Sequence, residues 1–251
     1  MAGSCSISIT GHMERPKVRR LAEKTARILN GFGAACEISD IERKKFNSAK
    51  AKLIIAVGGD GTLLRAAREQ RGSAPIIGIA AGEKSVLMRI KPGGMKKALE
   101  KIAAGEFSVE KRVRLRATAD GKKLPTALNE VMLVNRKSGG IINFCLRVGG
   151  KKVYCKKADG CIVATPTGST GHAYSAGGKK LSEKSGKIAV VPSNPLYREA
   201  KPVYFPAGTA IALDGFGAMQ KYEVVLDGQP RFAVRKRLVV RKGRDCFFAK
   251  I

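Results

Sequence analysis

Residues 53–70 read LIIAVGGDGTLLRAAREQ, and this stretch decides how the first part of the chain is organised. Leu53–Val57 is a short apolar run, which is typical of a strand buried on both faces. Three glycines and Asp60 interrupt the run, and Thr62–Gln70 then has the spacing of a helix. A strand, a glycine-rich loop and a helix in this order favour an α/β domain that binds phosphate groups.

The segments on either side continue the alternation of strand and helix. Further strands are expected at residues 4–10, 34–38 and 75–79, and further helices at residues 17–29 and 95–104. We therefore predict an α/β nucleotide-binding domain over residues 1–106.

Beyond residue 106 the sequence changes in character. Short strand-like segments follow one another, separated by turn signals that include Asp120-Gly121, Gly149-Gly150 and Asp227-Gly228. We predict a mostly antiparallel β-sandwich domain over residues 107–251. The place of residues 244–251 stays open, because they fit either the second domain or a return to the first.

The chain is strongly basic, with 48 Lys and Arg residues against 20 Asp and Glu residues and a net charge of +28. Such a surface attracts nucleic acids, anionic membranes and phosphorylated small molecules. The basic residues are spread along the whole chain and aromatic residues make up only 6%, so stacking platforms for nucleic acid are scarce. We expect no specific nucleic-acid partner, and no apolar run reaches the ~20 residues that span a bilayer.

Six cysteines and two histidines are the soft metal ligands of the chain. The cysteines form no CxxC pair, so neither a zinc site nor a disulfide framework is indicated. The N-terminal residues lack the apolar core of a leader peptide. We expect a cytoplasmic protein with reduced thiols.

The glycine loop is the first candidate site. Gly58, Gly59 and Gly61 allow backbone N–H groups to approach phosphate oxygens, and Thr62 stands at the start of a helix whose N-terminus carries partial positive charge. Asp60 is the exception, because a carboxylate beside phosphates must bind a cation or accept a proton. Its alternative role is to cap the following helix.

The second candidate site is the segment 158–178, ADGCIVATPTGSTGHAYSAGG. A short strand runs into a proline, a glycine and four hydroxyl side chains, which together can form an anion site built from neutral donors. Its alternative role is an ordinary capped turn. Ser169 is a poor hydrolase nucleophile, because the GxSxG spacing is missing.

Taken together, these stretches resemble the NAD kinase family. The resemblance consists of GGDGT at residues 58–62, Asn129-Glu130 about seventy residues later, Asp159-Gly160 leading into TPTGSTxxxxSAGG, and Asp227-Gly228-Gln229. Lipid kinases and phosphofructokinases have similar glycine loops, but the TPTGST element with Asn-Glu upstream separates the NAD kinases from them. The order and spacing agree over most of the chain.

The resemblance implies an enzyme that transfers a phosphoryl group from ATP, or from inorganic polyphosphate in some members, to the 2′-hydroxyl of the NAD adenosine ribose. Asp60 would then be the catalytic residue, Gly58, Gly59, Gly61 and Thr62 would hold phosphates, and Mg²⁺ would neutralise charge on the transferred group. The NAD-binding residues implied by the family pattern are Asn129, Glu130, Asp159, Thr170, Gly171, His172 and Ser175. It also implies a homodimer or homotetramer assembled through the β domain.

Several positions depart from the family pattern. His172 stands where many members have Tyr, and Ala80 and Ser85-Val86 replace Asn and Gly-Phe. Asn194 stands where a His is frequent.

Two other functions stay open at this point. A lipid or other small-molecule kinase could use the same loop, and a nucleotide- or nucleic-acid-binding module could have lost catalysis. Retention of Asp60 and Glu130 counts against the second, because pure binding has less need of two carboxylates near phosphates.

Overall fold

The chain forms two compact units, each described here by itself. They comprise Met1–Lys111 with Cys246–Ile251, and Arg112–Asp245. The computed structural model describes residues 7–42, 51–70, 72–82, 85–137, 139–196 and 200–251. The first three residues of the strand expected at 4–10 therefore lie outside the described residues.

The first unit is built on a six-stranded sheet with the order β2-β1-β3-β4-β17-β5. Its strands are β1 (Ile7–Gly11), β2 (Cys36–Asp40), β3 (Leu53–Gly58), β4 (Ile76–Ala80), β5 (Ser108–Arg112) and β17 (Cys246–Lys250). β1 pairs in parallel with β2 and β3, and β4 pairs in parallel with β3 and β17. The chain crosses from β1 to β2 in one direction and returns past β1 to β3, so the strand order reverses between β1 and β3.

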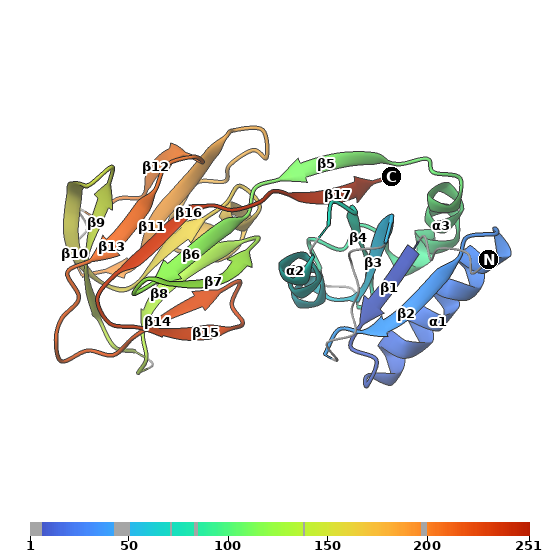
Figure 1. The fold of residues 1–251 in the computed structure, drawn as a ribbon, viewed down its shortest axis with the longest axis horizontal. Helices are drawn as coiled ribbons and strands as arrows, with labels where there is room; N and C mark the ends of the chain where they lie inside the picture. Colours follow the sequence, from blue (N-terminus) through green and yellow to red (C-terminus); the bar gives the residue numbers. More distant parts are fainter. Residues whose placement is uncertain (1–6, 43–50, 71, 83–84, 138, 197–199) are drawn as a thin grey trace. The chain divides into compact units, whose positions relative to one another are not determined.

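Helices cover both faces of this sheet, as Figure 1 shows. They are α1 (Pro16–Gly31), α2 (Asp60–Glu69) and α3 (Met95–Ala103), with a short 3₁₀ turn η1 (Pro92–Gly94) before α3. Val18, Ala22 and Leu29 of α1 and Leu99 of α3 share one core with alternate residues of the strands. Every residue of β1, β3 and β4 is buried, which explains the continuous apolar runs of β3 and β4. No helix among the described residues is both long and apolar enough to cross a membrane.

The second unit is a single antiparallel sheet of 11 described strands. They are β6 (Leu115–Ala119), β7 (Lys122–Ala127), β8 (Glu130–Asn135), β9 (Ile142–Val148), β10 (Lys151–Ala164), β11 (Lys187–Pro195), β12 (Val203–Pro206), β13 (Ile211–Asp214), β14 (Tyr222–Leu226), β15 (Arg231–Val234) and β16 (Leu238–Lys242). Its one interruption by helix among the described residues is the turn η2 (Gly168–Thr170) followed by α4 (His172–Ser175).

Side chains from most of these strands meet in one apolar core around the fully buried Phe144. The predicted fold class, an α/β unit followed by a mostly antiparallel β unit, is confirmed. The expected sandwich is made by one continuously hydrogen-bonded sheet. The sequence analysis missed the full length of β10, whose first half alternates exposed and half-buried residues, and it missed β11.

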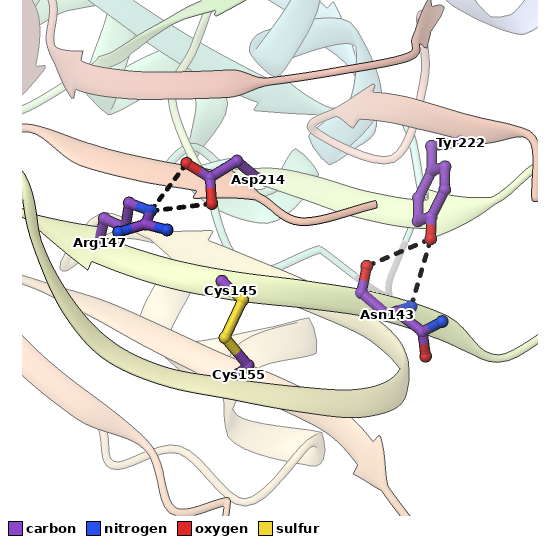
Figure 2. Close-up of a disulfide and its surroundings, with 6 residues drawn as sticks. All are labelled: Asn143, Cys145, Arg147, Cys155, Asp214 and Tyr222. Carbon is purple, nitrogen blue, oxygen red and sulfur yellow. Dashed lines mark hydrogen bonds and ion pairs between the residues drawn. A yellow bond between two sulfur atoms is a disulfide. The ribbon is translucent and has the colours of Figure 1, made fainter. Parts of the chain in front are cut away.

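The expectation that all thiols are reduced is wrong for two of them. Cys145 on β9 and Cys155 on β10 form a disulfide, shown in Figure 2. Their strands pair so that the two residues lie directly opposite each other, with Cα atoms 3.9 Å apart. Cys36, Cys161 and Cys246 are free, and Cys5 lies outside the described residues.

Candidate functional site

The glycine loop lies at the carboxyl end of the sheet in the first unit, where β3 ends at Gly58 and α2 begins at Asp60, so that Gly59 alone separates the two elements. A Cβ atom on Gly58 would collide with the side chain of Thr62, so this position needs glycine. A Cβ on Gly59 would meet nothing within 4 Å, which leaves the backbone there open to a ligand. We name Gly58–Thr62 the phosphate loop.

Asp60 is the first residue of α2 and is half-buried. Its Oδ1 accepts a hydrogen bond from the backbone N–H of Leu87, and its Oδ2 accepts one from that of Val86, both at 2.9 Å. The capping alternative is not what the geometry shows, because the N-cap residue of α2 is Gly59 and no side chain caps the helix. Both oxygens are fixed in direction, and each has a further lone pair for a ligand.

The Asn-Glu pair lies in the second unit, where β8 begins, and is held by a residue from far along the chain. The Asp227 carboxylate accepts hydrogen bonds from the backbone N–H groups of Leu128 at 3.1 Å, Asn129 at 2.7 Å and Glu130 at 3.3 Å. Asp227 is only 5% exposed. We name Leu128–Glu130 the Asn129 loop.

Two side chains of the Asn129 loop carry unusual chemistry. Glu130 is 7% exposed, and burial, followed by the nearby charge of Asp227, raises its pKa to about 7. It therefore changes charge near neutral pH, where an ordinary carboxyl group would already be ionised. The Oδ1 atom of Asn129 is buried and has no hydrogen-bond partner among the described residues. A buried acceptor without a partner is the kind of group that a bound ligand satisfies.

The turn after β10 packs directly on the Asn129 loop. Thr165 Oγ1 donates to the carbonyl of Leu128 at 2.6 Å, and the Thr165 N–H donates to the carbonyl of Asn129 at 2.9 Å. A Cβ on Gly168 would collide with the backbone of Asn129. The structure thus brings the TPTGST element and the Asn-Glu pair together.

Most hydroxyls of this turn have structural partners. Thr167 Oγ1 donates to Glu183 at 2.7 Å, and Glu183 in turn lies 3.4 Å from the buried Arg112. Ser169 Oγ donates to the Pro166 carbonyl and accepts from Leu181 N–H. The capped-turn alternative is therefore correct for these side chains.

The remaining predicted residues of the second unit lie on its surface. Thr170, Gly171, His172 and Ser175 are exposed on η2 and α4 or between them. Asp159 is exposed on β10 and accepts a hydrogen bond from Asn194 at 3.0 Å. Ala164, not Asp159, pairs with Glu130, so Asp159 lies about 16 Å further along the strand. The structure does not bring Asp159 to the Asn129 loop.

Asp227 and Thr165 are functional candidates that the sequence analysis did not assign to the site. Asp227 follows β14, 98 residues after Asn129, so no local spacing connects them. The only signal was that Asp227-Gly228 fits the family pattern.

The described residues contain no group of three or more His, Cys, Asp or Glu side chains that could hold a metal ion. Mg²⁺ commonly binds through substrate phosphates and water rather than through an all-protein cage. The acceptor set of Asp60 fits a magnesium ion that enters with a nucleotide.

Comparison with known proteins agrees with the sequence pattern at the phosphate loop and at the Asn129 loop. Residues 11–107 match the ATP-NAD kinase N-terminal domain, and residues 128–246 match the ATP-NAD kinase C-terminal domain. The chain is 31% identical over 232 residues to an NAD kinase from Methanopyrus kandleri, covering 89% of this chain and 84% of that protein. It is 32% identical over 230 residues to one from Methanosarcina barkeri, covering 92% and 81%.

Solved structures give the same result. The crystal structure of an NAD kinase from Archaeoglobus fulgidus in complex with ATP has a TM-score of 0.81 and 28% identity, covering 97% of this chain and 93% of that one. A yeast NADH kinase complexed with NADH shares the fold, with a TM-score of 0.82 at 20% identity, covering 98% and 83%. The chain belongs to the NAD kinase family.

Proposed function

We propose that this protein transfers the terminal phosphoryl group of ATP to the 2′-hydroxyl of the NAD adenosine ribose. The observation that carries the proposal is the carboxylate of Asp60, fixed by two backbone N–H groups at the end of a glycine loop. A pure phosphate cradle has no use for a carboxylate, whereas transfer to a hydroxyl needs an acceptor for its proton.

In the proposed reaction the 2′-oxygen forms a bond to the γ-phosphorus while the bond to the β–γ bridging oxygen breaks. ADP leaves, and the hydroxyl proton passes to Asp60. The hydrogen bonds from Val86 and Leu87 hold the carboxylate in one direction, so no side-chain freedom is lost when the hydroxyl arrives. Removing such a base typically costs 10²–10⁴ in rate.

The phosphate loop would hold phosphate oxygens with its backbone N–H groups and the N-terminal end of α2. The donor would enter as its magnesium complex, in which the metal neutralises charge on the phosphates. Inorganic polyphosphate offers the same linked phosphates and is proposed as an alternative donor.

The Asn129 loop would bind the adenosine part of NAD. Asn129 offers its unpaired buried oxygen to a ligand donor, and Glu130 accepts from ribose hydroxyls when ionised or donates when protonated. Thr170, Gly171, His172 and Ser175 are exposed to contact the same ligand. Asp159 lies too far along β10 to contact the adenosine part of a ligand held at the Asn129 loop, and we propose that it contacts NAD held by a second copy.

We further propose a homodimer or homotetramer assembled through the second unit, working in the cytoplasm, with NAD and ATP as its substrates. Neither a lipid substrate nor a purely binding role is favoured by the comparisons.

The test is NADP formation by the purified protein with NAD and Mg²⁺, with ATP and polyphosphate assayed separately as donors. Asp60→Asn should lower kcat by about 10²–10⁴ while leaving NAD binding measurable. Asp40→Asn is the matched control, because Asp40 ends β2 and its carboxylate, among the described residues, accepts a local hydrogen bond from the N–H of Glu42. Full activity of Asp60→Asn would overturn the role of Asp60, and no NADP from folded wild-type protein would overturn the function.

A further inference from the structure

A cavity of about 650 Å³ lies in the first unit, outside the residues assigned so far. Helix α1 lines one side with Lys17, Arg20, Leu21 and Lys24. The other side is lined by Ala80 at the end of β4, by the next two residues, and by Lys91-Pro92. No acidic side chain is among its described lining residues.

The cationic side chains of this cavity are arranged as a row. Lys17, Arg20 and Lys24 follow one face of α1, because their spacing of three and four residues matches the helical repeat. The row spans about 10 Å at the rise of an α-helix. All three side chains are exposed, and none makes an ion pair with another described residue. Lys91 stands opposite, where its ammonium group donates to the carbonyl and hydroxyl of Ser85 at 3.0 Å.

The position of the cavity is the one where α/β sheets bind ligands. It opens at the carboxyl end of β4 and beside the N-terminal half of α1, next to the point between β1 and β3 where the strand order reverses. Ala80 pairs with Gly58, and the Ala81 N–H donates to the Gly58 carbonyl at 2.8 Å. The cavity floor is therefore hydrogen-bonded to the first residue of the phosphate loop.

The stability of α1 does not explain why cationic side chains stand near its start. The first turn of α1 contains no acidic residue, although acidic side chains are favourable there and cations are unfavourable. Lys17, in the first turn, therefore stands where the helix dipole opposes it. An anion in the cavity would offset this repulsion.

We propose that this cavity binds the chain of linked phosphates of the phosphoryl donor, through Lys17, Arg20 and Lys24. The inference rests on the proposed function for the identity of the donor. The shared chemistry is an oligophosphate, carried either by a nucleoside triphosphate or by inorganic polyphosphate. A row of cations about 10 Å long suits an extended chain of several phosphates better than a single phosphate ion.

The first experiment measures binding of inorganic tripolyphosphate to the full chain by calorimetry. Arg20→Glu and Lys24→Glu should each weaken binding about tenfold, because attraction becomes repulsion. Arg27→Glu is the matched control, since Arg27 is exposed on the same helix but does not line the cavity. Equal affinities in Arg20→Glu and Arg27→Glu would overturn the site.

Steady-state kinetics show whether the oligophosphate that occupies the cavity belongs to ATP or to polyphosphate, and whether it is the phosphoryl donor. Arg20→Glu should raise KM about tenfold for ATP, for polyphosphate or for both, with KM for NAD unchanged. Lost tripolyphosphate binding with normal KM values for both donors would overturn the donor assignment. Wild-type protein that binds tripolyphosphate but makes no NADP would count against the proposed function alone, because the binding comparison tests the cavity independently.

Lys17→Glu separates binding from stability. An acidic residue near the start of α1 should raise Tm slightly while weakening tripolyphosphate binding. A fall in both Tm and tripolyphosphate affinity would indicate damage to the helix and would overturn a direct role of Lys17.

Discussion

The phosphate loop and the Asn129 loop achieve fixed geometry by different means. Gly58–Thr62 spans the junction of β3 and α2, and further hydrogen bonds to it come from the backbone N–H groups of Ala81, Val86 and Leu87. The Asn129 loop is positioned by remote residues, since Asp227 binds three of its N–H groups and Thr165 binds two of its carbonyls. The phosphate loop is thus held by backbone groups, which most substitutions leave in place, whereas the Asn129 loop depends on the side chains of Asp227 and Thr165.

The largest effect is expected at Asp227. Asp227→Ala removes the acceptor shared by three N–H groups, two of them in buried hydrogen bonds and one in a part-buried one, and should cost about 3–5 kcal/mol of unfolding free energy. Urea unfolding measures the loss, and the KM for NAD should rise at temperatures where the variant is folded. Asp214→Ala is a suitable control, because it removes a half-buried aspartate paired with Arg147 at 2.9 Å (Figure 2). Equal losses in both variants would show that Asp227 has no special role.

A smaller effect is expected at Gly168, where the turn after β10 packs on the Asn129 loop. Gly168→Ala places a methyl group against the backbone of Asn129 and should cost about 1–3 kcal/mol. Gly208→Ala adds the same methyl group where nothing lies within 4 Å. Thermal unfolding of the two variants tests whether Gly168 packs against the Asn129 backbone. Identical Tm values would refute this contact.

The smallest effect concerns pH. The pKa of Glu130 is raised from 4.5 to about 7 in the folded protein, so the folded state holds the proton more tightly than the unfolded chain. The stability contributed by Glu130 is therefore complete below about pH 4.5 and is lost as pH rises through about 7. Between pH 6 and 7.5 the loss should be about 1 kcal/mol. Glu130→Gln should flatten this part of the stability profile, and an unchanged profile would contradict the assignment.

The sequence predicted the parts of the molecule that depend on neighbouring residues. The run from Leu53 to Gln70 was correctly predicted as a strand followed by a helix because periodicity and glycine act locally. The helix begins at Asp60, two residues before the predicted start. The same reasoning could not assign Asp227 to the Asn129 loop, since their contact follows from the pairing of β14 with β8.

Two further features needed the structure for similar reasons. The disulfide requires the register of β9 and β10, and the placement of Cys145 and Cys155 about the Gly149-Gly150 turn was its only sequence signal. The first half of β10 was not predicted as a strand because its residues are largely charged and exposed.

The return of β17 to the first sheet sets the order in which that sheet can be completed during synthesis. β4 leaves the ribosome early, yet its neighbour β17 begins only at Cys246, after the whole second unit. At usual translation speeds this interval lasts on the order of ten to thirty seconds. Throughout it, Ile76 at the start of β4 lacks its partner Phe248, whereas Gly78 and Ala80 on the same edge already bond to Ile90. The unpaired part of the edge is a template for pairing with another nascent chain. The time of greatest aggregation risk for the nascent protein is therefore fixed by the length of the inserted second unit.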